Sequence, residues 1–132
     1  MSEKETEIIK ILLVDDEEEF VNTLSERMQI RGFEASVATD GPRAIEFISS
    51  HSPDVMVLDL RMPGMDGMQV LENVKKQKPE IEVIILTGHG SARDQEQAIR
   101  LGAFDYLQKP VGLETLVSRI RRAHRQKTFR NS

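Results

Sequence analysis

The chain has 132 residues and a mass of 15.0 kDa, the size of one domain. Its composition, 39% apolar and 30% charged with a net charge of −4, favours a globular fold over a disordered tail or a fibrous repeat. Cysteine is absent, which excludes disulfides, thiolate nucleophiles and cysteine metal sites. The acidic start and the short apolar runs predict no export signal and no membrane span, so we expect a cytoplasmic protein.

Five apolar segments rich in β-branched residues predict strands, most of them buried on both faces of a parallel sheet. They cover 8–14, 34–38, 55–58, 83–86 and 104–107. Residues at helical spacing follow each of them, in 20–28, 44–48, 68–74, the stretch after Gly90 that ends near Leu101, and 113–123. Strict alternation of strand and helix predicts an α/β fold, with a doubly wound parallel sheet as the middle of three layers.

Polar side chains follow four of the predicted strands. They are Asp15 and Asp16, then Asp59, then Thr87, then Lys109. Right-handed crossovers place all the strand-to-helix loops at one edge of the sheet, where ligands bind in such folds. The fold therefore gathers three carboxylates, one hydroxyl and one ammonium group at a single site.

Three carboxylates at one site repel each other, so we expect a cation to neutralise them. Oxygen ligands favour a hard ion, and Mg²⁺ is the expected cofactor. His51 and His124 are too remote to contribute and are predicted to face solvent. A metal beside an aspartate offsets charge on a phosphoryl group, with Lys109 and Thr87 adding a positive charge and a hydrogen bond. The set indicates phosphoryl transfer to aspartate.

Each residue also has an ordinary structural interpretation. Asp15 or Asp16 fits the N-terminus of a helix, and Thr87 fits a helix cap. Asp59 fits a loop acid, and Lys109 fits a solvated lysine. Taken together, these alternatives explain the sequence less well, because four unrelated structural roles would have to coincide on one edge of the sheet.

Four motifs carry a family resemblance. They are Leu-Leu-Val-Asp-Asp at 12–16, Val-Leu-Asp-Leu-Arg-Met-Pro-Gly-Met-Asp-Gly at 57–67, Leu-Thr-Gly at 86–88 and Lys-Pro at 109–110. Together they resemble the signature of the response-regulator receiver domains of bacterial two-component signalling. The resemblance covers 10–126 and implies a flavodoxin-like sheet with strand order 2-1-3-4-5 and five helices. We therefore expect an N-terminal extension with the start of the first strand in 1–9, a receiver domain in 10–126 and a tail in 127–132.

The resemblance implies that Asp59 is the phosphoacceptor, receiving its phosphoryl group from a sensor histidine kinase. Asp16 and Asp59 would bind Mg²⁺ directly, together with the backbone carbonyl of Arg61, and Asp15 would act through water. Lys109 would pair with the phosphoryl group, and its bond to Pro110 would be cis.

In the same family Thr87 would turn inward to bond the phosphoryl group while Tyr106 moves from exposed to buried. The output surface would comprise the helix after Gly90, the strand at 104–107 and the helix at 113–123. Arg61 and His89, two residues beyond Asp59 and Thr87, would influence hydrolysis of the acyl phosphate or simply face solvent. Such a protein is a switch that catalyses its own phosphorylation and dephosphorylation, not a turnover enzyme.

The expected partners are the sensor kinase, an output protein or effector domain, and a second copy in a phosphorylation-linked homodimer, but no membrane. The basic end of the chain suggests nucleic acid only as part of a longer transcription regulator; otherwise it is the solvated side of an amphipathic helix. Three alternatives stay open: a Mg²⁺-dependent phosphohydrolase of the haloacid-dehalogenase type with an aspartate nucleophile, a flavodoxin-like flavin binder, and an inert receiver-like interaction module.

Overall fold

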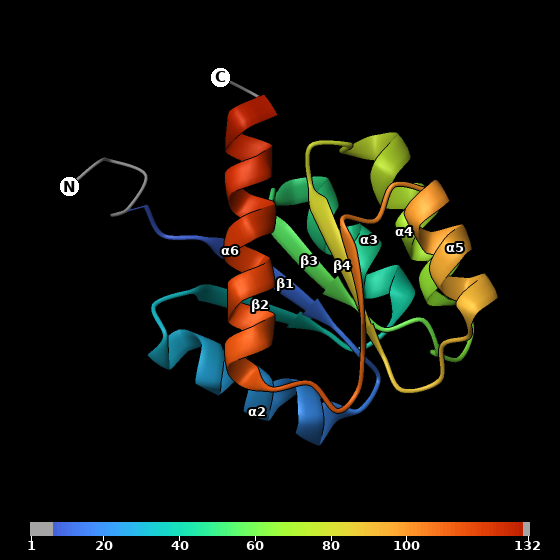
Figure 1. The fold of residues 1–132 in the computed structure, drawn as a ribbon, viewed down its shortest axis with the longest axis horizontal. Helices are drawn as coiled ribbons and strands as arrows, with labels where there is room; N and C mark the ends of the chain where they lie inside the picture. Colours follow the sequence, from blue (N-terminus) through green and yellow to red (C-terminus); the bar gives the residue numbers. More distant parts are fainter. Residues whose placement is uncertain (1–6, 131–132) are drawn as a thin grey trace.

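The computed structural model describes residues 7–130, with side chains for 7–127. Most of the predicted N-terminal extension and the last two residues of the predicted tail lie outside this range. The elements in chain order are β1 Lys10–Val14, α2 Glu18–Ile30, β2 Glu34–Ala38, α3 Gly41–Ser50, β3 Val55–Leu58, α4 Gly67–Gln77, β4 Glu82–Thr87, α5 Ala92–Arg100, β5 Asp105–Gln108 and α6 Leu113–Arg130 (Figure 1).

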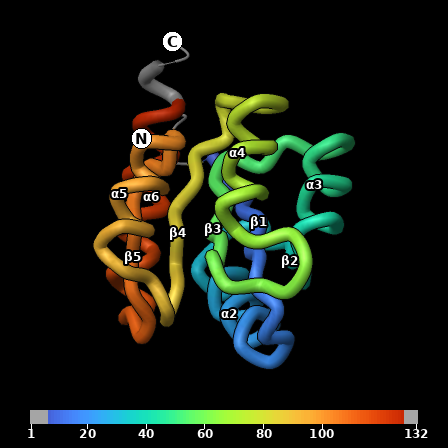
Figure 2. The backbone as a smooth tube through the Cα atoms, turned by 90° about the vertical axis from the view of Figure 1, so that its right-hand side faces the viewer, coloured from blue at the N-terminus to red at the C-terminus, as the bar shows by residue number. Residues whose placement is uncertain are grey.

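The five strands form one parallel sheet in the order β2-β1-β3-β4-β5, as predicted. Figure 2 shows β5 with α5 at one side of the molecule and α3 at the other. The first strand begins two residues later than predicted, at Lys10, and Ile8 is exposed. The chain order reverses between β1 and β3, so the loops after these two strands open side by side.

Side chains that alternate along each central strand build two separate cores. Leu12 and Val14 on β1 pack on the face covered by α3, α4 and α5. Ile11 and Leu13 pack on the opposite face, which α2 and α6 cover. Figure 1 shows α2 and α6 together on one side of the sheet. The unbroken apolar runs in the sequence follow from this burial on both faces.

Helix ends agree with the local sequence. The Asp40 carboxylate accepts a hydrogen bond from the Arg43 amide at the start of α3, and Asp66 forms a capping box with Gln69 at the start of α4. Gly32 follows α2 with φ +91°, a left-handed conformation that favours glycine. These signals fix where each loop begins at the edge of the sheet.

Helix α6 packs on the sheet through residues spaced three and four apart, among them the buried Leu116 and Ile120. His124 lies four residues after Ile120, on the same face, and is only 8% exposed. Its Nε2 lies 3.8 Å from Oε2 of Glu7. The prediction that His124 faces solvent is therefore wrong, whereas His51 is exposed as predicted.

Among the described residues, no helix combines the length and the apolar character that crossing a membrane requires.

Candidate functional site

The polar residues predicted to meet at one edge of the sheet do lie there. Asp15 follows β1, Asp59 follows β3, Thr87 ends β4 and Lys109 follows β5. Backbone hydrogen bonds continue the sheet into this edge: the Asp15 amide donates to the Ala38 carbonyl, and the Asp59 amide to the carbonyl of the last β1 residue. The side chains therefore start from a rigid frame.

Lys109 is the centre of the site. Its Nζ lies 2.7 Å from Oδ2 of Asp15, 3.2 Å from Oε1 of Glu17 and 3.8 Å from Oδ2 of Asp59. The ammonium group also sits 4.3 Å from the centre of the Phe20 ring. The bond between Lys109 and Pro110 is cis, as predicted. With a side chain only 16% exposed, Lys109 is not the solvated lysine of the alternative interpretation.

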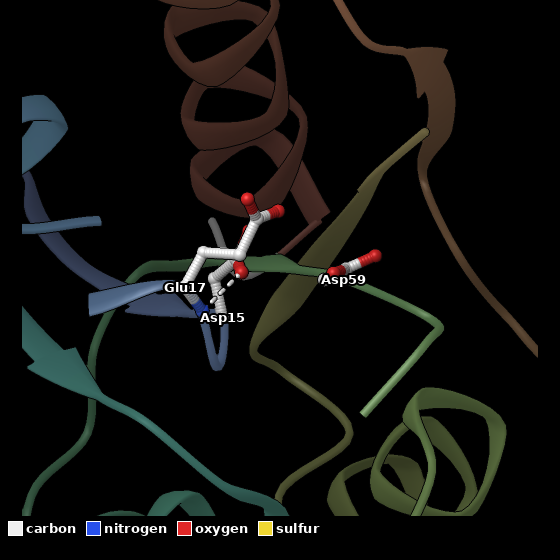
Figure 3. A group of neighbouring side chains, drawn as sticks. All are labelled: Asp15, Glu17 and Asp59. Carbon is white, nitrogen blue, oxygen red and sulfur yellow. Dashed lines mark hydrogen bonds between the residues drawn. The ribbon is translucent and has the colours of Figure 1, made fainter. Parts of the chain in front are cut away.

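Three carboxylates, those of Asp15, Glu17 and Asp59, each offer an oxygen within 4.8 Å of the others. Figure 3 shows them beside the ends of β1 and β3. Asp15 and Asp59 are buried, whereas the Glu17 side chain is 66% exposed. The sequence interpretation missed Glu17, although the acidic run from Asp15 to Glu19 offered a signal. An amide hydrogen bond from Glu17 to Oδ1 of Asp15 holds the turn between them.

Asp16 is exposed and lies outside this group of three within the described part of the chain. The alternative that Asp15 or Asp16 caps the first helix is wrong: α2 begins at Glu18, and its N-cap is Glu17, with no side-chain capping bond. Asp15 instead points its carboxylate toward Lys109. Asp59, only 5% exposed, is likewise not an ordinary loop acid.

Burial raises the pKa of Asp15 above its ordinary value, with a smaller contribution from the charge of Asp59, against hydrogen bonds from Lys109 and from the Glu17 amide that lower it. Burial alone would lower the pKa of Lys109. The hydrogen bonds and charges of Asp15, Asp59 and Glu17 together outweigh that effect and raise it. The site thus favours the charged ammonium group of Lys109 and disfavours ionisation of the Asp15 carboxyl group beside it.

The loop after Asp59 turns back tightly onto the start of α4. The Gly67 amide donates to the Leu60 carbonyl at 3.0 Å. A side chain at position 67 would overlap the Asp59 carbonyl oxygen and come within 2.6 Å of the Leu60 Cα. Glycine is needed here for space, and it keeps the phosphoacceptor loop predicted from the sequence close to the helix.

Thr87 is completely buried, and its Oγ1 accepts a hydrogen bond from the His89 amide at 3.4 Å. It caps no helix, because the N-cap of α5 is Ser91. Tyr106 lies on the neighbouring strand, where it pairs with Ile85. Its side chain is half-buried, and its hydroxyl oxygen is shielded from solvent.

Arg61 lies two residues beyond Asp59, and its amide donates to Oδ1 of Asp59 at 3.3 Å. Its guanidinium group, with the side chain 57% exposed, turns toward α5 and pairs with Asp94 at 3.0 Å. The guanidinium group also donates to the carbonyl of His89 at 3.3 Å, so Arg61 links the Asp59 loop to the loop before α5.

The donor set fits a hard divalent cation. Carboxylate oxygens are the ligands that Mg²⁺ and Ca²⁺ prefer. The described group contains no thiolate or imidazole, which transition metals would favour. Burial is the main cause of the raised pKa of Asp15, and a bound cation would favour the ionised carboxylate against it.

Comparison with known proteins agrees with this geometry. Residues 11–121 match the family model of the response regulator receiver domain. The chain is 36% identical to the putative response regulator NtrX-like of Rickettsia bellii over 118 residues, and 36% identical to the regulatory protein AtoC of Escherichia coli over 118 residues. These alignments cover 88% and 89% of the chain but 25% and 26% of the relatives.

A solved response regulator receiver domain protein from Clostridium thermocellum superposes with a TM-score of 0.88 at 35% identity, covering 92% of this chain and 98% of that one. The chain belongs to the response regulator receiver domains, the signalling modules of two-component systems. It spans about a quarter of the length of the two curated relatives named above.

Proposed function

We propose that this receiver domain is a phosphorylation-dependent switch, in which Asp59 accepts a phosphoryl group from a histidine of a sensor kinase. The observation that carries the proposal is the placement of Asp59 at the carboxyl edge of the sheet. There it is buried beside Asp15 and Lys109, with the Lys109 Nζ 3.8 Å from its Oδ2. A receiver domain and its kinase form the usual two-component pair.

In the proposed reaction, a carboxylate oxygen of Asp59 attacks the phosphorus atom of phosphohistidine. The new O–P bond makes an acyl phosphate while the P–N bond breaks, and the imidazole leaves with the bonding electron pair. Lys109 offsets charge on the phosphoryl oxygens, and the hydroxyl of Thr87 donates a hydrogen bond to one of them. The shielding of Asp59 limits attack by water on the product.

Asp16 and Asp59 with the Arg61 carbonyl are the proposed direct ligands of Mg²⁺, and Asp15 acts through water. When bound, Mg²⁺ offsets negative charge on the phosphoryl group. Glu17 is the alternative to Asp16 as a ligand, because its carboxylate and not that of Asp16 lies in the group with Asp15 and Asp59. Variants of Asp16 and Glu17 separate the two arrangements.

The proposed output is a change of the surface formed by α5, β5 and α6, where Thr87 and Tyr106 move together. The receiver is proposed to span 10–126, to be cytoplasmic and to signal to an output protein or an effector domain. A phosphorylation-linked homodimer through the same surface is part of the proposal. DNA would be a partner only through an effector domain of a longer regulator.

Intact-mass measurement after incubation with Mg²⁺ and acetyl phosphate tests the proposal. We expect an adduct of one phosphoryl group that is absent from Asp59→Asn and retained in Asp54→Asn, which alters an acid at the other edge of the sheet. Steady release of phosphate without an adduct would favour the phosphohydrolase. The absence of both adduct and turnover would favour the inert interaction module.

A further inference from the structure

The hydroxyl of Tyr106 is buried without a hydrogen-bond partner, the one such side-chain oxygen or nitrogen found among the described residues. A buried polar group without a partner is destabilising, so the surrounding structure must favour this position of the ring. The segment that covers it is the loop of residues 88–91 between β4 and α5.

Gly90 provides the space for this hydroxyl. A Cβ atom at position 90 would overlap the Tyr106 hydroxyl oxygen, lie 2.6 Å from its Cζ and lie 3.0 Å from Cγ2 of Thr87. Gly90 is not among the glycines with positive φ, so its backbone conformation is open to other residues. Glycine is therefore required at this position because Tyr106 occupies the space that a side chain would need.

Arg61 and Asp94 hold the same loop in place. The Arg61 guanidinium Nη2 donates to Oδ2 of Asp94 at 3.0 Å and to the carbonyl of His89 at 3.3 Å. Asp94 also forms a capping box with Ser91. The Ser91 amide donates to Oδ2 of Asp94 at 3.2 Å, and the Asp94 amide donates to Oγ of Ser91 at 3.1 Å. The loop is thus tied to the start of α5 and, through Arg61, to the segment after Asp59.

The ion pair also lies close enough to the phenol to influence its charge. Burial raises the pKa of Tyr106, the negative charge of Asp94 raises it further, and Arg61 lowers it. The phenol, the loop and the ion pair therefore form one cluster on the face where β5 meets α5.

We propose that Gly90 and the Arg61–Asp94 ion pair are positioning residues that keep Tyr106 inward: Gly90 leaves room for the hydroxyl, and the ion pair keeps the loop closed over it. Arg61 thereby links the loop of Asp59 to the orientation of Tyr106. Only the signalling consequence of this link rests on the proposed function, since the position of the ring can be measured without any phosphodonor.

The chain itself supplies the probe, because Tyr106 is its one tyrosine and it has no tryptophan. Ultraviolet titration and acrylamide quenching of tyrosine fluorescence report on this residue alone. In Gly90→Ala we expect the phenol to move outward, so that its pKa falls toward its ordinary value of 10.0 and quenching rises toward that of free tyrosine.

Gly88→Ala is the matched control, in the same loop. The nearest atoms to a Cβ there are Cβ and Cδ of Lys109, both at 3.9 Å, which is ordinary contact. We expect this variant to keep the titration and quenching of the original protein. If both alanine variants expose Tyr106 equally, or if Gly90→Ala leaves it shielded in a folded protein, the role of Gly90 is refuted.

Arg61→Gln tests the ion pair with a substitution at an exposed side chain, so we expect the variant to fold. Loss of one exposed ion pair predicts a roughly two-fold rise in the outward population of Tyr106, seen as stronger quenching. Asp94→Asn, which retains a side-chain oxygen able to accept a hydrogen bond from the Ser91 amide, should give a change in the same direction. Unchanged quenching in both variants would refute the role of the ion pair, even if Gly90→Ala failed to fold.

These measurements are separable from the test of the proposed function. If no phosphoryl adduct forms but Tyr106 responds to the substitutions as expected, the proposed switch is refuted and the positioning role stands. Normal phosphorylation with Tyr106 unaffected by the substitutions at positions 61, 90 and 94 would support the switch and refute the positioning role.

Discussion

At the edge of the sheet where the strands begin, Asp54 has a separate partner for each carboxylate oxygen. Oδ1 accepts from Nζ of Lys127 at 2.8 Å, and Oδ2 accepts from the Lys10 amide at 2.9 Å. At the edge where the strands end, three carboxylates share one ammonium group: within the described residues, the ion pairs of Asp15, Glu17 and Asp59 all involve Lys109.

The two edges therefore differ in what they leave unmatched. Asp54 ties the start of β1 to the last helix and needs no further ligand. The other edge keeps an excess of negative charge in a partly buried place, which costs stability until a cation arrives. Acids that are matched by the protein's own groups stabilise the fold, and acids that are not matched prepare a site for a ligand.

The largest expected effect is the response to metal. At a Mg²⁺ concentration about one hundred times the Kd, binding should add about 2.7 kcal/mol to the free energy of unfolding. Asp59→Asn and Asp16→Asn should remove most of this gain in urea denaturation, because each loses a proposed ligand. Glu17→Gln should retain it. A loss in Glu17→Gln with a normal response in Asp16→Asn would show that Glu17 is the ligand.

The next effect is at the opposite edge. Asp54→Asn weakens the contact with Lys127 and should lower the free energy of unfolding by about 1–2 kcal/mol. The gain from Mg²⁺ should remain as in the unmodified chain. Urea denaturation with and without Mg²⁺ measures both quantities, and a changed response to Mg²⁺ would contradict the separation of the two edges.

The smallest effect is a pH dependence in metal-free protein. Because burial raises the pKa of Asp15, the native state keeps a proton that the unfolded chain has lost. The free energy of unfolding should therefore fall as the pH rises from 3.8 through the raised pKa. Asp15→Asn should remove this decline and raise the free energy of unfolding at neutral pH. A variant less stable than the parent at neutral pH would show that the bond to Lys109 outweighs burial.

The sequence predicted the sheet well, because strands buried on both faces leave long apolar runs such as 55–58. It also predicted the residues that end the strands, since topology alone brings Asp15, Asp59 and Lys109 together. Glu17 was missed because an exposed acid in an acidic run looks like any helix start.

Contacts between distant loops were beyond reach for a different reason. Arg61 and Asp94 are 33 residues apart, and their ion pair depends on loop conformations that no periodic pattern records. The burial of His124 likewise depends on how far α6 continues along the sheet. This helix extends to Arg130.

The most direct test of the central claim is to locate the phosphoryl group on the chain. Borohydride reduces an aspartyl phosphate to homoserine, so the protein treated with acetyl phosphate and Mg²⁺ can be reduced, digested and sequenced by mass spectrometry. We predict homoserine at position 59 and aspartate unchanged at positions 15 and 16. Homoserine at either of those two positions, or at none of the three, would contradict the assignment of Asp59 as the phosphoacceptor.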